Sequence, residues 1–285
     1  PRLVTSGIWR PVYVEAWDDA RLNDVFIRQQ EVNKNRATIL GEIEILADKE
    51  IDKAIISITE ASSGKVLAGQ VVSLKKGMNK VSLPLSIRNP KLWWSNGLGE
   101  QYLYDFRTDL TIDNRTADTQ TKKVGLRSLK IINQPDKDGK TFYVELNGVP
   151  IFAKGANYIP QDNFLPRVTR EQYEKTILDA ANVHMNMLRI WGGGIYEEDL
   201  FYDLCDRHGI LVWQDFMFAC SVYPLTPELE ENIRQEAIDN VIRLRNHPSL
   251  AIWCGNNEIH TAWFNWGWMK KFDQYGVTEQ LRNDT

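Results

Sequence analysis

The segment LAIWCGNNE, residues 250–258, indicates both the type of fold and the place of its chemistry. Its first four residues are apolar, which is typical of a short buried strand. Asn256, Asn257 and Glu258 follow within five residues of Trp253. A carboxylate is rarely buried without a partner, so a glutamate directly after a buried strand predicts a functional edge of a sheet.

Three earlier apolar runs end in polar or aromatic residues in the same way. They are PIFAKGAN (150–157), NMLRIW (186–191) and ILVWQD (210–215). Helical stretches separate the runs: Thr169 and Gln172 form a capping box, and Thr226-Pro227 begins another helix. Strands that alternate with helices indicate parallel βαβ units, and a (β/α)8 barrel carries its chemistry at the C-terminal strand ends. Four such units predict half of a barrel.

The first half of the chain has a different period. Apolar and polar residues alternate, as in Ile43 and Ile45 against Glu42 and Glu44, and glycine-containing turn signals separate the runs. Roughly seven short strands suit an immunoglobulin-like sandwich. The predicted fold class is therefore multidomain β plus α/β: an immunoglobulin-like β-sandwich over residues 21–128, followed by the first half of a (β/α)8 TIM barrel over 129–285. A further strand is predicted over GIWRPVYVEAW (7–17), in a preceding domain.

The composition excludes several classes of partner. The net charge is −4 with Lys and Arg scattered, which gives no basis for binding nucleic acid or an anionic membrane. No apolar run approaches the ~20 residues that cross a bilayer, so we expect a soluble chain without membrane insertion. Three cysteines form no CxxC pair and four histidines show no metal spacing, so we expect buried thiols and no metal site.

The N-terminal sequence does not report a compartment. Pro1 is neither an initiator methionine nor part of a signal peptide, so we expect the chain to begin within a longer one. A periplasmic, extracellular or lysosomal-type compartment therefore stays open.

Six stretches of the chain resemble the β-mannosidases of glycoside hydrolase family 2. They are SGIWRPVYVEAW (6–17), KLWWSNGLGEQYLYDF (91–106), VGLRSLKI (124–131), FAKGANYIPQDNF (152–164), NMLRIWGGGIYEEDLFYDLCDRHGILVWQDFMFAC (186–220) and HPSLAIWCGNNE (247–258). RIWGGGIYE (189–197) points to mannosidases over galactosidases or glucuronidases. The resemblance implies a sugar-binding β-domain, of which residues 1–20 would be the tail and linker, then an immunoglobulin-like domain and a catalytic (β/α)8 barrel.

The resemblance also implies an activity and a set of site residues. The activity is retaining hydrolysis of terminal, non-reducing β-D-mannose residues from β-mannosides, without a cofactor. Glu258 would be the general acid/base, and Asn257 would hydrogen-bond the sugar 2-hydroxyl. Four further residues are candidates for substrate binding, the first two as walls of the pocket and the others as orienting polar groups: Trp191, Trp266, Arg189 and Asn157.

The chemistry explains why the acid/base is a carboxyl group. Such a group must hold its proton near neutral pH in order to give it to a leaving oxygen. Packing Glu258 among Trp253, Trp263 and Trp266 would favour the protonated form by desolvation.

Retention needs a second carboxylate, a nucleophile ~5–5.5 Å from the first. The resemblance implies a glutamate that ends strand seven, beyond Thr285, and it does not make Asp215 the nucleophile. We therefore expect the chain alone to be inactive. Half a barrel also leaves unpaired strand edges, so we expect self-association.

Other readings of the sequence stay open. A family 2 enzyme for another sugar (β-galactosidase, β-glucuronidase or exo-β-glucosaminidase) is one alternative, and a non-catalytic carbohydrate-binding protein is another. Trp263 and Trp268 could equally be core residues. The run Gly192–Gly194 lacks the spacing of a phosphate-binding loop, which favours a tight turn.

Overall fold

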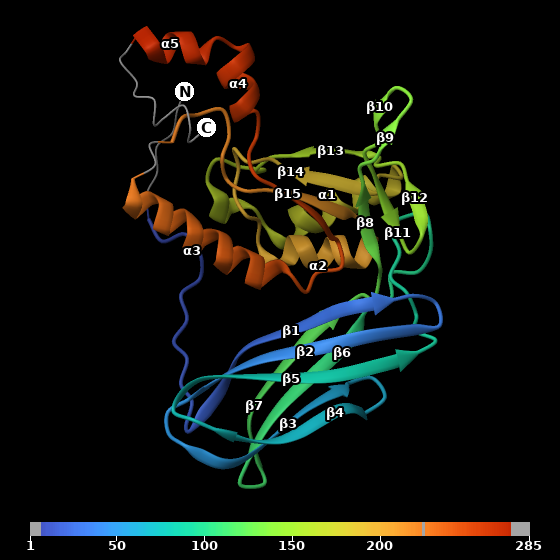
Figure 1. The fold of residues 1–285 in the computed structure, drawn as a ribbon, viewed down its shortest axis with the longest axis vertical. Coiled ribbons are helices and arrows are strands. Elements are labelled where there is room, and N and C mark those ends of the chain that lie inside the picture. The colour runs from blue at the N-terminus through green and yellow to red at the C-terminus, as the bar shows by residue number, and fades with distance from the viewer. Residues whose placement is uncertain (1–6, 224–225, 275–285) are drawn as a thin grey trace. The chain divides into compact units, whose positions relative to one another are not determined.

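A computed structural model describes residues 7–223 and 226–274, which form two compact units (Figure 1). Unit 1 runs to Ala153 and includes the short later segments Asp206–Gly209 and Asn246–Ser249. Unit 2 comprises Lys154–Cys205, Ile210–Arg245 and the described residues from Leu250 onward. The domain boundaries expected from the sequence, after residues 20 and 128, stay predictions, since one compact unit can hold more than one domain.

Unit 1 is built on two antiparallel sheets that pack as a sandwich. Among the described residues, one sheet has the order β1-β2-β5, with β1 (Ala20–Val32), β2 (Arg36–Ala47) and β5 (Gly77–Arg88). The other has the order β4-β3-β6-β7, with β3 (Ile51–Glu60), β4 (Lys65–Leu74), β6 (Tyr104–Ile112) and β7 (Arg115–Val124). One buried hydrophobic cluster takes side chains from both sheets. The predicted sandwich-like half of the chain is therefore confirmed.

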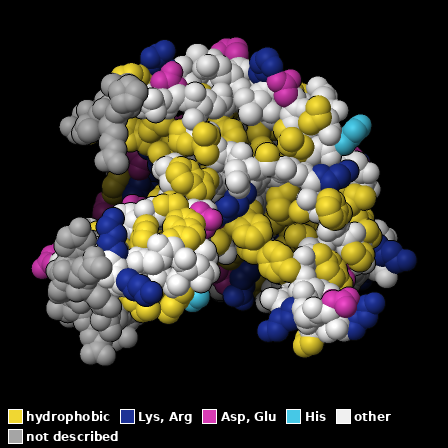
Figure 2. Space-filling view, turned by 90° about the horizontal axis from the view of Figure 1, so that it is seen from above, with side chains coloured by type: hydrophobic (Ala, Val, Ile, Leu, Met, Phe, Trp, Pro, Cys, Tyr) yellow, Lys and Arg dark blue, Asp and Glu magenta, His cyan; other side chains and the backbone are white. Residues whose placement is uncertain are grey.

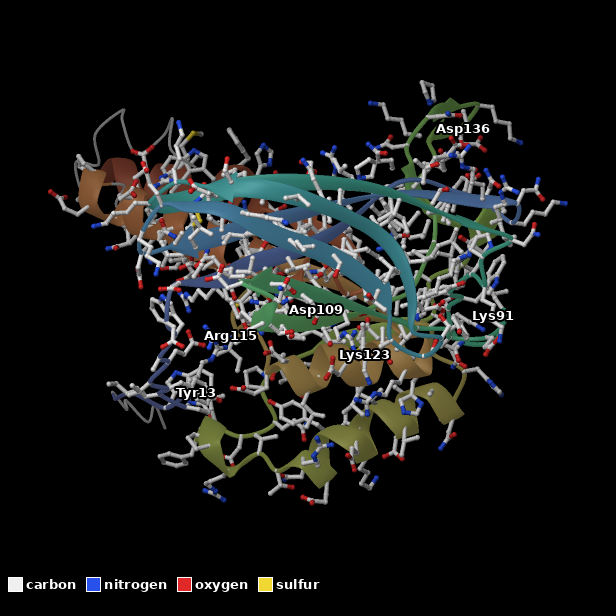
Figure 3. The ribbon with its side chains drawn as sticks, turned by 90° about the horizontal axis from the view of Figure 1, so that it is seen from below. Tyr13, Lys91, Asp109, Arg115, Lys123 and Asp136 are labelled. Atoms are coloured by element: carbon white, nitrogen blue, oxygen red, sulfur yellow. The ribbon has the colours of Figure 1, made fainter. Side chains whose placement is uncertain are left out.

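Alternation along the strands creates this core. On β6, Tyr104, Phe106, Thr108 and Leu110 are buried, whereas Asp105, Arg107 and Asp109 between them are partly or fully exposed. The polar side of the same sheet carries Asp109 of β6 and Lys123 of β7, both labelled in Figure 3. The period-two pattern of the sequence thus predicts correctly which side chains face inward.

The segment over residues 7–17 is not a strand, so that prediction is wrong. Val12, Tyr13 and Val14 are exposed, and no described strand pairs with the segment (Figure 3 labels Tyr13). A strand needs a hydrogen-bonding neighbour, and an alternating pattern does not by itself supply one.

A small antiparallel sheet and a hairpin follow the sandwich along the chain. The sheet contains β8 (Leu129–Ile132), β11 (Tyr143–Leu146) and β12 (Val149–Ile151), and the hairpin pairs β9 (Pro135–Asp136) with β10 (Gly139–Lys140). Asn147 and Gly148 both have positive φ, which suits the tight turn between β11 and β12. The β11–β12 pairing divides the single strand predicted over 150–157, because Pro150 and Ile151 belong to β12 and pair with β11.

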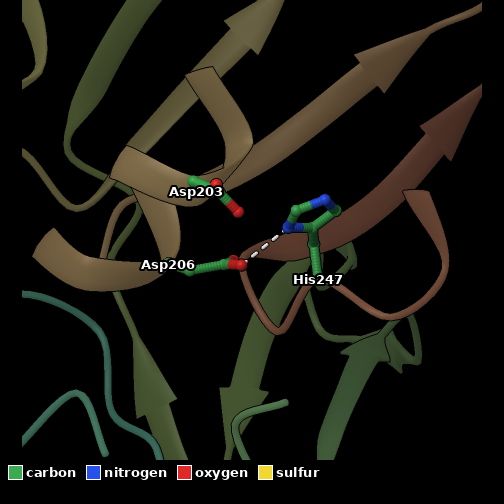
Figure 4. Close-up of side chains that lie close together, drawn as sticks. All are labelled: Asp203, Asp206 and His247. Atoms are coloured by element: carbon green, nitrogen blue, oxygen red, sulfur yellow. Dashed lines mark hydrogen bonds and ion pairs between the residues drawn. The ribbon is translucent and has the colours of Figure 1, made fainter. Parts of the chain in front are cut away.

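Hydrogen bonds attach the two later segments to unit 1. The indole Nε1 of Trp93 donates to the backbone oxygen of Asp206 at 2.8 Å, and Arg127 Nε donates to the backbone oxygen of Pro248 at 2.7 Å. The Asp206 carboxylate lies 2.6 Å from His247 Nδ1 and accepts from the backbone N–H of Ser249 (Figure 4). Both Asp206 oxygens are engaged in joining these segments, which indicates a structural role.

Unit 2 contains the parallel sheet that the sequence predicts. Its described strands are paired in chain order: β13 (Gly155–Tyr158), β14 (Met187–Ile190), β15 (Leu211–Asp215) and β16 (Leu250–Cys254). The connections carry η1 (Leu165–Arg167), α1 (Arg170–Asn182), α2 (Asp199–His208) and α3 (Pro227–Leu244), and α4 (Ile259–Asn265) and α5 (Trp268–Gln274) follow β16. None of the described helices has the length and apolar character that a bilayer span requires.

Local signals set the helix starts as expected. Thr169 and Gln172 form a reciprocal capping box at α1, and the Thr226 hydroxyl accepts from Leu229 N–H at the start of α3. Helices α1, α2 and α3 pack on one face of the sheet, where Leu188, Ile190 and Val212 belong to the same buried cluster as side chains of these helices. Since side chains alternate along a strand, the residues between these three point to the opposite face.

The sandwich core gives a testable prediction about stability. Ile58 of β3 is fully buried, so Ile58→Ala should lower the free energy of unfolding by about 2–5 kcal/mol through lost burial and a residual cavity. Ile55→Ala, on the exposed side of the same strand, is the matched control and should cost less than about 1 kcal/mol. Urea unfolding followed by circular dichroism measures both; equal losses would contradict the assigned faces.

Candidate active site

The strand β16 ends at a backbone turn that points Glu258 outward. Glu258 is the N-cap residue of α4, with φ 61° and ψ 12° in the left-handed region, and it is exposed. A left-handed conformation costs a residue with a Cβ about 1–2 kcal/mol, and such strain concentrates at functional sites. The expectation that Glu258 is buried among tryptophans is wrong for the described chain.

The loop after β15 holds the backbone of Asn257 next to Glu258. Phe216 N–H donates to Cys254 O, and Asn257 N–H donates to Phe218 O, each at 2.8 Å. A parallel bridge between Ala219 and Asn257 continues the pairing. The strands β15 and β16 thus stay aligned beyond their ends, which fixes where the Asn257 side chain starts.

The Asn257 side chain connects Glu258 to the sheet. Its oxygen accepts from Arg189 Nη2 at 2.9 Å, and its nitrogen donates to Glu258 Oε2 at 3.1 Å. The same nitrogen lies 3.4 Å from the Cys220 sulfur. Asn257 is buried although it is polar, and these contacts satisfy its amide.

Strand register brings Arg189 to the same place. Asn157, Arg189 and Trp213 are neighbours across β13, β14 and β15, and all three face away from the helices. Arg189 Nη1 reaches Asn157 Oδ1 at 3.4 Å, and its guanidinium lies 5.8 Å from the Trp213 ring centre. Four of the six residues predicted for the site, Glu258, Asn257, Arg189 and Asn157, therefore form one connected network.

Asp215, the last residue of β15, completes the network through Arg189. Its carboxylate forms two hydrogen bonds with Arg189, from Nε at 3.1 Å and from Nη2 at 2.7 Å. Gly192 N–H and Trp213 Nε1–H also donate to it, at 3.0 and 3.1 Å. The sequence shows Asp215 at a strand end, yet the predicted site leaves it out.

The first glycine of the run after β14, Gly192, lies where its backbone N–H must come close to Asp215. A Cβ on Gly192 would lie 2.7 Å from Phe216 O and 2.8 Å from Phe218 O, so a larger residue would push the N–H away from Asp215. Gly192 thus makes a tight backbone contact with the Asp215 carboxylate. This agrees with the expected turn and gives no support to a phosphate cradle.

The two predicted pocket tryptophans lie outside the network of contacts. Trp191 is partly buried, and its ring occupies the space where a Cβ on Gly193 would be placed. Trp266 ends α4, is half exposed and meets Trp268 edge to face at 6.3 Å. Among the described contacts, none joins either ring to Glu258, so their pocket roles stay predictions.

Two other tryptophans are explained by packing. Trp263 is buried in α4, and Trp253 stacks on Phe216 with ring centres 5.1 Å apart. Of the two readings left open for Trp263, the core reading is therefore the one the structure supports.

Unit 2 also exposes large hydrophobic side chains. Figure 2 shows hydrophobic side chains gathered in several areas of the face that it draws. The exposed ones of unit 2 include Ile159, Phe164, Phe264 and Trp266. Single exposed apolar side chains are common on folded proteins, so these four do not by themselves define a binding surface.

Buried tyrosines lie on the helix side of the sheet. Burial raises the pKa of the Tyr158 phenol, and the Glu197 carboxylate raises it further. Burial likewise raises the pKa of Tyr173, whose hydroxyl donates to Glu197 at 2.7 Å. Both phenols therefore stay neutral in any ordinary buffer, and they act as hydrogen-bonding core groups.

Cys220 is a neighbour of Glu258 that the sequence did not reveal. Its sulfur lies 3.9 Å from Glu258 Oε2, and it is exposed, contrary to the expectation of buried thiols. It sits in an irregular loop with φ 46°, so no period places its side chain.

Residues 20–127, which include the two sandwich sheets, match the model of the glycosyl hydrolases family 2. This part of the chain is therefore similar to a domain of the glycosyl hydrolases family 2.

Particular relatives narrow this class. Beta-mannosidase B from Aspergillus clavatus is 40% identical over 288 residues, an alignment that covers 100% of this chain and 33% of that protein. Beta-mannosidase B from Thermothelomyces thermophilus is 40% identical over 260 residues, covering 90% of this chain and 30% of that protein. The chain spans about a third of the length of the curated relatives it matches.

Solved structures agree with these relatives. The β-D-mannosidase from Dictyoglomus thermophilum has 40% identity and a TM-score of 0.81, and the match covers 87% of this chain and 31% of that one. An exo-chitosanase from Amycolatopsis orientalis has 20% identity and a TM-score of 0.73, covering 83% and 28%. At that identity the second likeness shows the fold alone.

The placement of Cys220 can be checked by alkylation. Iodoacetamide should modify exposed Cys220 well before Cys205, which is fully buried, because reaction needs access to the thiolate. Mass spectrometry of timed digests gives both rates, and the same reaction in urea is the control, in which the two rates should converge. Equal rates in the folded chain would contradict the placement of the loop.

Proposed function

We propose that the chain is part of a retaining β-mannosidase, in which Glu258 is the general acid/base. The observation that carries the proposal is the Asn257–Glu258 pair that follows β16, in which Asn257 is hydrogen-bonded to Arg189 on the face of the parallel sheet opposite α1, α2 and α3. Relatives named β-mannosidase, 40% identical over 90% or more of the chain, support the choice of sugar.

Glu258 has the exposure that a proton donor to a substrate needs. As a carboxylic acid it would protonate the glycosidic oxygen as the bond to the anomeric carbon breaks. As a carboxylate it would then take a proton from the water that releases mannose. Its hydrogen bond from Asn257 orients one oxygen, Oε2, and leaves the orientation of the group defined before substrate arrives.

Asn257 would bind the sugar 2-hydroxyl, where hydrogen bonds strengthen in the transition state. Its amide hydrogens face Glu258 and the Cys220 sulfur. Since sulfur is a weak acceptor, a sugar hydroxyl could replace it at low cost. Arg189 and Asn157 would orient polar groups beside it, and Trp191 and Trp266 would stack on the apolar face of the sugar.

The rest of the catalytic machinery is proposed to lie beyond this chain. A nucleophilic carboxylate ~5–5.5 Å from Glu258 is needed for retention, and we assign it to a glutamate beyond Thr285. The parallel sheet and its helices would be the first half of a (β/α)8 barrel over residues 129–285, after an immunoglobulin-like domain over 21–128 and the linker and tail of a sugar-binding domain over 1–20. The residues present would need no cofactor.

Two properties of the isolated chain follow. Without a nucleophile it would not turn over a β-mannoside. In the described sheet β13 and β16 are edge strands, and edge strands template pairing with further chains, so self-association is expected.

A second candidate is a family 2 enzyme for another β-linked sugar. The fold shared with the exo-chitosanase keeps it open, although that likeness rests on 20% identity. A non-catalytic carbohydrate-binding role is less well supported, because it gives no reason for the polar network at the strand ends.

The proposal is tested in the protein at its full natural length by Glu258→Ala. Methyl β-mannoside, whose leaving group needs a proton, should lose about 100- to 10,000-fold in kcat/KM. The leaving group of 2,4-dinitrophenyl β-mannoside, 2,4-dinitrophenolate, departs without protonation. The loss in kcat/KM on that substrate should therefore be far smaller.

Glu228→Ala, an exposed carboxylate in the first turn of α3, is the matched control and should leave both rates unchanged. An equal loss on both substrates would show that Glu258 is not the proton donor. Hydrolysis of another β-glycoside but not of mannosides would move the proposal to the second candidate.

A further inference from the structure

Asp215 is a buried carboxylate for which the acid/base chemistry provides no role. Its side chain is 0% exposed. Each oxygen accepts two hydrogen bonds: Oδ1 from Arg189 Nε and Trp213 Nε1, and Oδ2 from Arg189 Nη2 and Gly192 N. A buried charge is tolerated only when it is paired and hydrogen-bonded in this way. With its lone pairs engaged, Asp215 cannot act as an acid, a base or a nucleophile on a sugar.

The ion pair fixes the plane of the Arg189 guanidinium. Two parallel hydrogen bonds to one carboxylate define both the position and the tilt of the group, which a single bond would not. Trp213 reinforces the arrangement, because its indole binds Asp215 while its ring lies near the guanidinium.

Arg189 in turn decides which way the Asn257 amide points. Arginine has only donors, so the group that faces Arg189 Nη2 at 2.9 Å must be the amide oxygen. The amide nitrogen then faces the opposite way, toward Glu258 Oε2 at 3.1 Å. A flipped amide would set two donors against each other at Arg189 and two acceptors against each other at Glu258.

We propose that Asp215 is a positioning residue, which acts through Arg189 to hold the Asn257 amide with its nitrogen toward Glu258 and the sugar 2-hydroxyl. The inference rests on the proposed function, since it gives Asn257 and Glu258 their catalytic roles. It adds a dependence of those roles on a carboxylate that does not touch the substrate.

The test is a double-mutant cycle in the full-length protein, with kcat and KM measured on 4-nitrophenyl β-mannoside. Asp215→Asn keeps the shape but loses the charge, so Arg189 is released and the amide loses its fixed orientation. We expect kcat/KM to fall about 100-fold, mainly through kcat, which is the size of effect seen when one transition-state donor is lost. Asn257→Ala should give a similar loss. The double variant should be no slower than Asn257→Ala by more than about threefold, because both changes remove the same interaction.

Two further variants separate positioning from stability. Asp206→Asn removes another buried, fully bonded carboxylate and is the matched control: it should lower the thermal midpoint and leave kcat unchanged. If Asp215→Asn does not fold, Trp213→Phe takes its place, since it removes one donor to Asp215 and keeps the ion pair. It should give a smaller loss in kcat that likewise disappears in the Asn257→Ala background.

The inference would be overturned if the loss in kcat/KM of the double variant equalled the product of the two single losses. An Asp215→Asn enzyme with an unchanged kcat would also overturn it. Failure of the proposed function looks different: the unmodified enzyme would not hydrolyse the mannoside. If it hydrolyses another β-glycoside instead, the same cycle is run on that sugar, and the prediction for Asp215 is unchanged.

Discussion

The ion pair between Arg189 and Asp215 is the interaction on which the site depends. It joins β14 to β15 on the face of the sheet opposite α1, α2 and α3, and Arg189 in turn binds Asn257 beyond the end of β16. Without Asp215, a guanidinium in this partly buried position would lack its counter-charge, and the amide beside it would have no preferred orientation. The Asn257 amide that binds Glu258 Oε2 is therefore oriented by Arg189 of β14 and Asp215 of β15.

The fold makes this interaction possible through register. Parallel pairing places Asn157, Arg189 and Trp213 side by side, and alternation directs all three away from the helices. Continued pairing between the loop after β15 and Asn257 then brings the amide within reach of Arg189. Gly192 contributes because it has no Cβ, which leaves room for its N–H to approach Asp215.

Sequence patterns predicted the elements well and the contacts less well. Alternation predicted the inward face of β6, and apolar runs predicted the parallel strands β14, β15 and β16, because these properties depend on the local sequence. The prediction of a strand over residues 7–17 was wrong, since an alternating sequence does not supply the neighbouring strand that it must pair with.

The burial of Glu258 failed as well. Apolar neighbours in the sequence suggested an enclosed side chain, but Glu258 is exposed at a left-handed backbone turn. Asp215 stood at a predicted strand end, yet its partners come from Trp213, from Arg189 and from a glycine. Only the pairing of strands shows that these meet.

The roles proposed for Asn257 and Asp215 depend on cleavage of a β-mannoside at this sheet edge, with Glu258 as the acid/base. A crystal structure of the full-length protein with a mannose-configured transition-state analogue tests it most directly. In that structure the Glu258 carboxylate should lie within about 3 Å of the position of the glycosidic oxygen, the Asn257 nitrogen should bind the 2-hydroxyl, and Asp215 should bind Arg189 without touching the sugar. An analogue bound away from Glu258, or held directly by Asp215, would contradict it.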